Sequence, residues 1–188
     1  MAHPRKLIRH AVRDLLIAAN TAAGARVKGT RVEPHKSSQL PAIGVYTLND
    51  PIAEDGSTNT EQAHELELEV VGWVAHTEAL PADDAMDDLA EQIEAAMNAE
   101  VADDDGPFLG GKVSEIRFVG TVMEVVEDNA RTSPNVGIVV LTYAMTYRAG
   151  ITAADPADDF ETVDATHKIA GGVGNTVPAE DQFTVLAP

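Results

Sequence analysis

Three glutamates at alternate positions are the residues in this chain whose spacing most resembles a chemical site: Glu65, Glu67 and Glu69. If their segment is a strand, side chains two apart share one face and lie roughly 7 Å from each other, and such a row can be read as catalytic or metal-binding. The intervening residues are all apolar: Leu66, Leu68 and Val70. Because this alternation is typical of a strand with one wet and one buried face, we interpret the glutamates as the solvent face of an antiparallel strand.

Two glycine-rich segments come close to nucleotide-binding motifs without matching them. Residues 106–113 are one residue short of a phosphate-binding P-loop, because Val113 stands where a Ser or Thr would hold magnesium. A strand is expected to follow, whereas a phosphate site needs the N-terminus of a helix. Residues 171–174 lack the spacing and the βαβ setting of a dinucleotide site. We therefore expect neither segment to bind a nucleotide.

The remaining candidates for metal binding or catalysis are weaker. No two of the six histidines have metal-binding spacing on one helix, and we interpret His64 and His76, which flank one predicted strand, as surface or rim residues. Residues 103–106 resemble the start of a calcium loop, but the closing glutamate is out of register. The chain has no cysteine and no Gly-x-Ser-x-Gly motif. We expect no metal site, no cofactor and no enzyme activity, although carboxylates that meet only in the fold could still form an acid–base pair.

The net charge of −18 is unevenly distributed along the 188 residues. Residues 1–40 hold 8 Lys and Arg against 2 acids, residues 41–150 hold 4 against 22, and residues 151–188 hold 1 against 7. Duplex DNA is bound by basic surfaces, so the acidic body argues against a nucleic-acid-binding protein. It is compatible with a surface past which DNA slides without sticking, and also with solubility alone.

The composition favours a soluble protein made in a reducing cytoplasm. The lack of cysteine excludes a disulfide framework. Charged residues interrupt the N-terminal segment, so it lacks the apolar core of a secretory signal. No stretch approaches the roughly 20 apolar residues that span a bilayer. With only 4 Phe, 3 Tyr and 1 Trp, the core must consist mainly of Val, Leu, Ile and Ala.

Periodicity predicts two helices and five strands. Residues 4–23 repeat apolar side chains at helical spacing between Pro4, which suits a first turn, and Gly24, which suits a stop. Residues 82–99 form a second helix with acids in its first turns. The predicted strands are residues 26–33, 41–48, 62–75, 113–126 and 136–148. Because each element has one apolar side, we expect an α+β fold: a mostly antiparallel or mixed β-sheet with two helices packed on one face.

The chain changes character after Arg148, so we divide it into a body, residues 1–148, and an extended C-terminal arm, residues 149–188. The arm is too poor in apolar residues to offset the entropy of ordering by itself. Residues 182–186 alternate well enough to join a neighbour's sheet edge through Phe183 and Val185. The arm is therefore either a segment that orders on assembly or a permanently flexible tail.

A line of basic residues along the first helix is the other candidate interface: Arg5, Arg9 and Arg13, spaced four apart. Residues four apart lie on the same side of a helix. The line can be a solvated basic edge or a stripe that docks on an acidic neighbour.

The order of these segments resembles a known family. A His-Pro-Arg-Lys-Leu-Ile-Arg helix start at 3–9 is followed by residues 25–34, a Leu-Pro-Ala-Ile-type strand within 39–47, the acidic strand, the Asp-rich helix and a closing strand at 137–148. Over roughly residues 3–148, this pattern is similar to the tail terminator proteins of bacteriophages, also called minor tail or tail completion proteins.

The resemblance implies a structural virion protein. Such a protein would form a ring of six subunits on the last layer of the tail tube, where it ends tail polymerisation and offers a surface to the neck or head-completion protein. It would be made in the host cytoplasm and located at the head–tail junction, with DNA passing through the lumen without specific binding. The alternatives are a head–tail joining, neck or tail-tube protein, and an acidic ligand-binding or calcium-binding module or unrecognised hydrolase.

Overall fold

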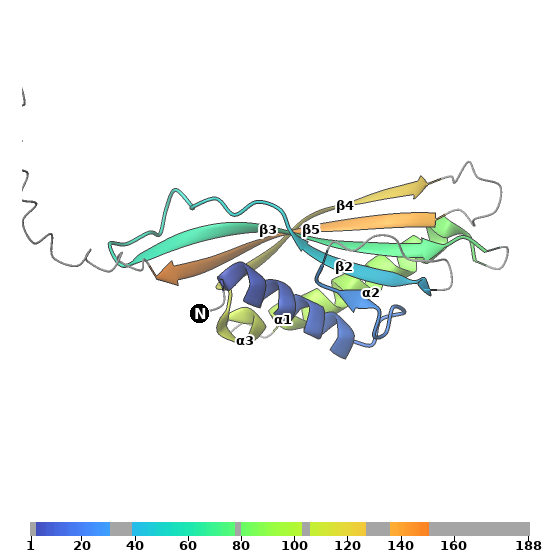
Figure 1. The fold of residues 1–188 in the computed structure, drawn as a ribbon, viewed down its shortest axis with the longest axis horizontal. Coiled ribbons are helices and arrows are strands. Elements are labelled where there is room, and N and C mark those ends of the chain that lie inside the picture. Colours follow the sequence, from blue (N-terminus) through green and yellow to red (C-terminus); the bar gives the residue numbers. More distant parts are fainter. Residues whose placement is uncertain (1–2, 31–38, 78–79, 103–105, 127–135, 151–188) are drawn as a thin grey trace, which may run out of the picture. The chain divides into compact units, whose positions relative to one another are not determined.

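Two fifteen-residue strands, β3 (Glu61–Ala75) and β5 (Val136–Gly150), form the centre of a five-stranded sheet (Figure 1). They pair antiparallel along their whole length. β2 (Ala42–Thr47) pairs antiparallel with β3, and β4 (Glu115–Val126) pairs antiparallel with β5. The short β1 (Val27–Lys28) lies parallel to β2, which gives the order β1-β2-β3-β5-β4. The expected mixed, mostly antiparallel sheet is therefore confirmed.

The computed structural model describes residues 3–30, 39–77, 80–102, 106–126 and 136–150. Residues 151–188 of the C-terminal arm proposed from the sequence, with Phe183 and Val185, lie outside these residues. So do the calcium-loop-like residues 103–105 and the end of the strand expected at 26–33. No helix in the described ranges is both long and apolar enough to cross a membrane.

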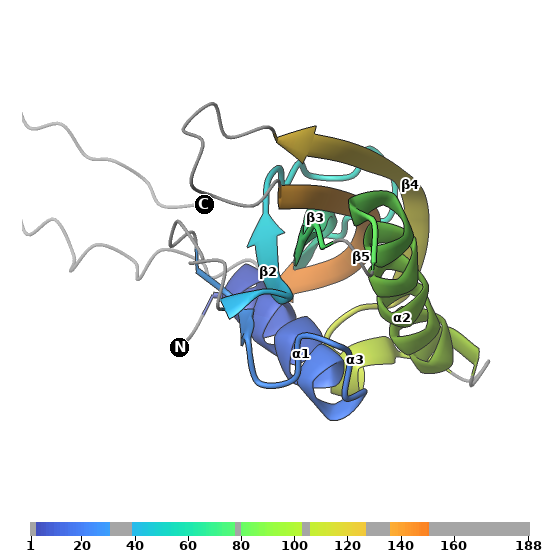
Figure 2. The same cartoon turned by 90° about the vertical axis from the view of Figure 1, so that its right-hand side faces the viewer.

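Both long helices cover the same face of the sheet (Figure 2). α1 (Pro4–Ala18) packs over β1 and β2, and α2 (Ala82–Ala102) packs over β3 and β5. A short helical turn, α3 (Phe108–Gly111), follows α2. The prediction of two helices on one face is confirmed, and α3 is an addition within the region expected to be a turn.

The core lies between this helix layer and one face of the sheet. Buried residues recur every three or four positions on α1, namely Ile8, Val12 and Leu16, and on α2, namely Met86, Leu89, Ile93 and Met97. On the strands the buried residues alternate, as they must when successive side chains point to opposite faces: Leu66, Leu68 and Val70 on β3, and Val139, Leu141, Tyr143, Met145 and Tyr147 on β5. Among the residues that the structure describes, no helix lies on the opposite face of the sheet (Figure 1).

The element bounds differ from the prediction at several ends. α1 stops at Ala18 and not near residue 23, because Asn20 adopts a left-handed backbone with φ 53° and Asn and Thr favour turns over helix interiors. α2 continues to Ala102. β5 runs to Gly150, two residues past the expected end, because Ala149 and Gly150 pair with the first residues of β3. The sheet therefore includes two residues that were assigned to the arm.

Candidate functional site

β4 is the most exposed strand of the sheet, and none of its residues is buried. It ends the strand order and pairs only with β5, so along its outer edge the backbone has no strand partner among the described residues. Val122 is 66% exposed and Val119 is 54% exposed. Four more large apolar side chains of this strand are also exposed: Phe118, Met123, Val125 and Val126. β4 thus presents an open edge and an apolar surface together.

Both faces of β4 contribute to this surface. Val122 pairs with Val140 and lies on the sheet face that has no helix. Met123 pairs with Val139, whose side chain is buried under the helices, so it points to the helix side. It is nevertheless exposed, because α2 lies mainly over β3 and β5 and touches β4 less. The fold leaves the edge strand uncovered on two sides.

Monomeric proteins usually protect such an edge with charges, prolines, bulges or very short strands. β4 has a bulge between Phe118 and Gly120, and two of its three charged residues, Glu115 and Arg117, lie before the bulge. Beyond the bulge, Glu124 is the single charge. A contiguous exposed apolar patch of this kind marks an interaction site. The second half of β4 is therefore the strongest candidate for a protein–protein contact in the described chain.

The opposite edge of the sheet is different in length and charge. β1 has only two residues, of which Val27 is buried and Lys28 is exposed. α1 lies beside it: a Cβ placed on Gly29, just after β1, would lie 3.7 Å from the Arg9 Nε atom. The two edges of the sheet therefore expose a long apolar strand on one side and a short strand with a basic helix on the other.

The predicted basic line on α1 does not form one free stripe. The Arg5 Nε atom lies 3.3 Å from a carboxylate oxygen of Asp50. Arg13 pairs with its neighbour Asp14 at 2.6 Å. Arg9 has a buried Nε atom with no hydrogen-bond partner in the described part of the chain. Arg9 lies on the side of α1 next to β1, whereas Arg5 and Arg13 are already paired with carboxylates of their own subunit.

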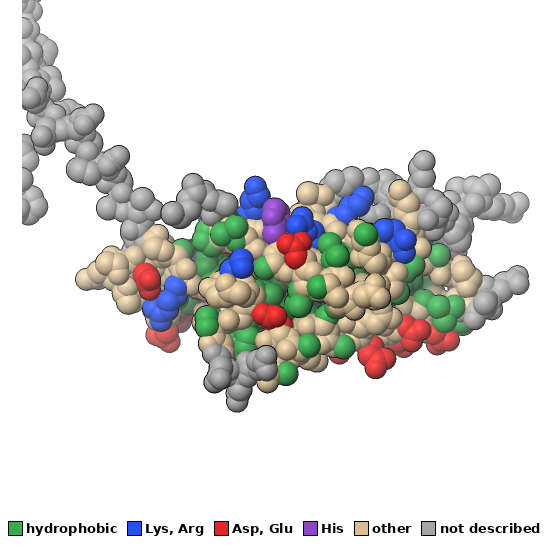
Figure 3. All heavy atoms as spheres, turned by 90° about the horizontal axis from the view of Figure 1, so that it is seen from below, with side chains coloured by type: hydrophobic (Ala, Val, Ile, Leu, Met, Phe, Trp, Pro, Cys, Tyr) green, Lys and Arg blue, Asp and Glu red, His purple; other side chains and the backbone are tan. Residues whose placement is uncertain are grey.

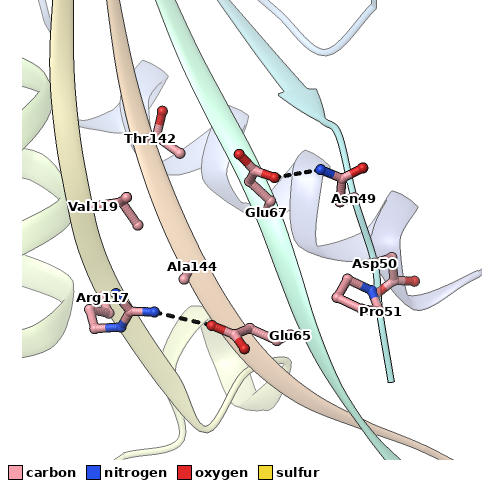
Figure 4. A pocket seen from close by; sticks show the side chains of 9 residues that line it. All are labelled: Asn49, Asp50, Pro51, Glu65, Glu67, Arg117, Val119, Thr142 and Ala144. Atoms are coloured by element: carbon pink, nitrogen blue, oxygen red, sulfur yellow. Dashed lines mark hydrogen bonds and ion pairs between the residues drawn. The ribbon is translucent and has the colours of Figure 1, made fainter. Parts of the chain in front are cut away.

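The predicted glutamate row does lie on the face of the sheet without helices. Glu65 and Glu67 line a hollow of about 620 Å³, open to solvent, whose other walls come from β4, β5 and the segment after β2 (Figure 4). An Arg117 nitrogen lies 3.1 Å from Glu65, and the Asn49 side-chain amide donates to Glu67 at 2.7 Å (Figure 4). Each carboxylate therefore already has a partner. Within the described ranges, no three His, Asp or Glu side chains are grouped to hold a metal ion.

A second polar cluster was not predicted, and it centres on the buried carboxylate of Asp50, whose side chain is 8% exposed. The Tyr147 hydroxyl donates to it from β5. The His64 Nδ1 atom lies 3.4 Å from Asp50, and its ring stacks on Tyr147 with centroids 4.9 Å apart. With Arg5, this cluster joins the first turn of α1 to both central strands.

Burial and the hydrogen bond to Asp50 raise the pKa of the Tyr147 hydroxyl well above its ordinary value. A tyrosine held neutral in this way is a hydrogen-bond donor and not a base. The cluster anchors the first turn of α1 through Arg5, so its geometry supports a structural role.

The interpretation of His64 as a surface or rim residue is wrong. It lies within β3, on the same side of the strand as Leu66, and its side chain is 15% exposed. Strand parity was the signal that could have placed it there, because residues 64, 66, 68 and 70 share one face. His76 does lie on the surface, just after β3, where its Nδ1 atom accepts from the Ala82 backbone N–H at the start of α2.

A scan of the chain against protein-family models found no matching family, and a search of curated proteins found no relative.

Proposed function

We propose that this chain is a structural subunit that assembles with copies of itself into a closed ring, as a tail terminator of a long-tailed bacteriophage does. The observation that carries the proposal is β4, a twelve-residue edge strand that exposes Val119, Val122 and four other large apolar side chains. Such a strand is suited to be covered by another protein surface and is unfavourable in a permanent monomer.

The rest of the chain is consistent with an assembly protein. The two sheet edges differ in length, charge and apolar character, so they are unlike surfaces of one subunit. Contacts between unlike surfaces of identical subunits are heterologous, and they close into a ring when the rotation between neighbours permits it. The sequence resemblance over residues 3–148 adds the specific role: a ring, with six copies as the expected number, on the end of a tail tube.

In that role the subunit would end tail polymerisation and provide the attachment surface for a neck or head-completion protein. Its partners would be its own copies, the tail tube protein and the neck protein. The net charge of −18 suits a ring through which DNA passes, because an acidic lumen would not retain the phosphate backbone. The proposed location is the head–tail junction of the virion, and the proposed role is structural and not catalytic.

The oligomeric state tests this proposal. Light scattering behind size exclusion, with negative-stain images, is expected to reveal rings of uniform size for the full chain. Val122→Lys is expected to weaken assembly, since it places a charge at the centre of the apolar patch, while the thermal melt by circular dichroism stays nearly unchanged. Ile52→Lys is the matched control, because Ile52 is also a large apolar residue, 54% exposed, but lies outside β4.

Two outcomes would contradict the proposal. A strict monomer at every accessible concentration would remove its basis, and rings that form equally well with Val122→Lys would show that β4 is not the contact. Long filaments in place of single rings would favour the alternative of a tail-tube subunit. In a phage that carries this gene, Val122→Lys should give tails of uncontrolled length, whereas a neck protein would leave tail length unchanged.

A further inference from the structure

The two flanks of the folded body carry opposite charge. In the view onto the helix layer, Lys and Arg side chains gather along one side of the molecule, and a group of Asp and Glu lies towards the other (Figure 3). α1 lies over β1 and β2, whereas α2 lies over β3 and β5 and reaches β4. The charges of the two helices therefore lie at opposite edges of the sheet.

The β1 flank consists of the side of α1 next to β1, together with Lys28. The Arg9 Nε atom and the His10 ring both lie within 4 Å of the position that a Cβ on Gly29 would take. Lys6 and Arg13 are three residues before and four residues after Arg9, so they share its side of the helix. The pKa of His10 is lowered, first by burial and then by the positive charges of Arg13, Arg9 and Lys6, which agrees with this clustering.

The β4 flank consists of the exposed apolar residues of β4 and the acidic side of α2 above them. Gln92 marks the side of α2 that faces α1, because its side-chain oxygen accepts from the Ala22 backbone N–H at 2.6 Å. Asp83, Asp87 and Glu94 are spaced so that they share the opposite side. The negative charge of Glu94 contributes, after burial, to a raised pKa of Tyr143 on β5, which agrees with its position towards β4.

The acids of the β4 flank are available to a partner. Asp83 and Asp87 are exposed, and among the described residues neither makes an ion pair. On the β1 flank, Lys6 and Lys28 are likewise exposed without an ion pair in the described chain. That flank also has an apolar residue, Ile17, which is 38% exposed and lies four residues after Arg13. Each flank thus has exposed charges without an ion pair and exposed apolar side chains. The charges of the two flanks are of opposite sign.

We propose that the β4 flank of one copy docks on the β1 flank of the next, with Asp83, Asp87 and Glu94 facing Lys6, Arg9 and Arg13. The inference rests on the proposed function, because it specifies how copies of this chain meet in the ring. Complementary charge sets the orientation of two surfaces and disfavours like-with-like contacts. Two β4 flanks would bring acids against acids, so the contact runs head to tail and repeats in one direction around the ring.

Charge reversal on each flank of the full-length chain tests this arrangement. Asp83→Lys with Asp87→Lys changes the β4 flank, and Lys6→Glu with Arg13→Glu changes the β1 flank. Each double variant should need at least about tenfold more protein to form rings, because two attractive pairs become repulsive. A 1:1 mixture of the two separately purified variants should restore rings, since every contact in an alternating ring again joins opposite charges. Native mass spectrometry should find equal numbers of the two.

The matched control is Asp84→Lys with Asp88→Lys, which makes the same change of net charge on the same turns of α2 but outside the β4 flank. This control should assemble as the wild type does. Wild-type assembly should also weaken as salt rises, because exposed charge pairs are screened. Circular dichroism melts of all variants establish that the subunits remain folded.

Three results would overturn the inference. The β1-flank variant could assemble normally while the β4-flank variant does not, which would mean that the β4 flank meets a surface other than the β1 flank. The control could disrupt rings as strongly as the β4-flank variant, which would make the effect one of net charge. Phe183→Lys with Val185→Lys could disperse the rings while both flank variants leave them intact, which would mean that the C-terminal segment covers β4. In each case wild-type rings still form, so the proposed function survives; a wild type that never assembles would overturn both.

Discussion

The Tyr147 hydroxyl on β5 lies 2.8 Å and 3.0 Å from the two carboxylate oxygens of Asp50, a residue 97 positions earlier in the chain. This contact places a buried carboxylate where Arg5 of α1 and His64 of β3 also reach it. A single side chain in the segment after β2 therefore holds the N-terminal helix against the two strands at the centre of the sheet.

Removal of the Tyr147 hydroxyl should destabilise the fold. Tyr147→Phe leaves the buried Asp50 carboxylate without its donor from β5, so we expect the free energy of unfolding to fall by about 1–3 kcal/mol. Urea denaturation followed by circular dichroism measures the change. Tyr143→Phe is the control on the same strand, because the Tyr143 hydroxyl is buried without a hydrogen-bond partner in the described structure. If Tyr143→Phe lowers the free energy of unfolding as much as Tyr147→Phe does, the hydrogen bond from Tyr147 to Asp50 is not the cause of the loss.

Stability should decline in alkaline solution through the same residues. Burial raises the pKa of both Tyr143 and Tyr147, so the folded protein keeps protons that the unfolded chain releases above its tyrosine pKa of about 10. The contribution of these two tyrosines to the free energy of unfolding is complete below that pH. Above it the contribution falls by about 1.4 kcal/mol per pH unit for each tyrosine. Urea titrations between about pH 9 and 11 should give a shallower decline for Tyr147→Phe. Parallel curves for that variant and the wild type would refute the prediction.

The contact between α2 and the sheet should be sensitive to one added methyl group at Gly72. A Cβ there would lie 2.7 Å from the Leu89 Cδ2 atom and 2.9 Å from the Val139 Cγ1 atom, so one of these buried side chains must move. We expect Gly72→Ala to lower the free energy of unfolding by about 1–3 kcal/mol in thermal or urea denaturation. Gly120→Ala on β4 has open space around the new methyl group and should cost little. Equal effects at the two positions would argue against close packing of α2.

The position of the turn after α1 should depend on Gln92 of α2. The Gln92 side-chain oxygen accepts from the Ala22 backbone N–H at 2.6 Å, and Gln92→Ala removes that acceptor. We expect a loss of about 0.5–1.5 kcal/mol in the free energy of unfolding, measured in urea. Gln92→Glu keeps an oxygen acceptor at the same position and should retain most of the stability. If both variants lose the same amount, the hydrogen bond is not the cause.

The parts of the fold that follow a local period could be predicted from the sequence. β3 and β5 alternate buried and exposed residues, and α2 repeats its buried residues at helical spacing, so the layers and the sheet-facing sides were correct. The outward position of Glu65 and Glu67 followed from the same alternation. Residues 19–23 were placed in the wrong element because a helix end depends on single residues such as Asn20 and not on a period.

The Asp50 cluster could not be predicted because its members come together only through strand register. Asp50 belongs to a segment without a repeat, and nothing local indicates that β5 places Tyr147 above it. The exposure of β4 was equally hidden. The sequence predicts that this strand, like the others, buries one apolar side, and only the strand order, together with the position of α2, shows that Val122 and Met123 lack a covering layer.

The unequal lengths of the two outer strands, twelve residues in β4 and two in β1, have a practical consequence. If the ring assembles through β4, a subunit with a blocked β4 can still bind one neighbour through its intact β1 flank. It then has no surface to which the next subunit can bind. Small amounts of such a protein would stall the wild type before the circle is complete. Co-expressed Val122→Lys would then be dominant-negative. The fractional loss of infectious particles would exceed the fraction of subunits that carry Val122→Lys.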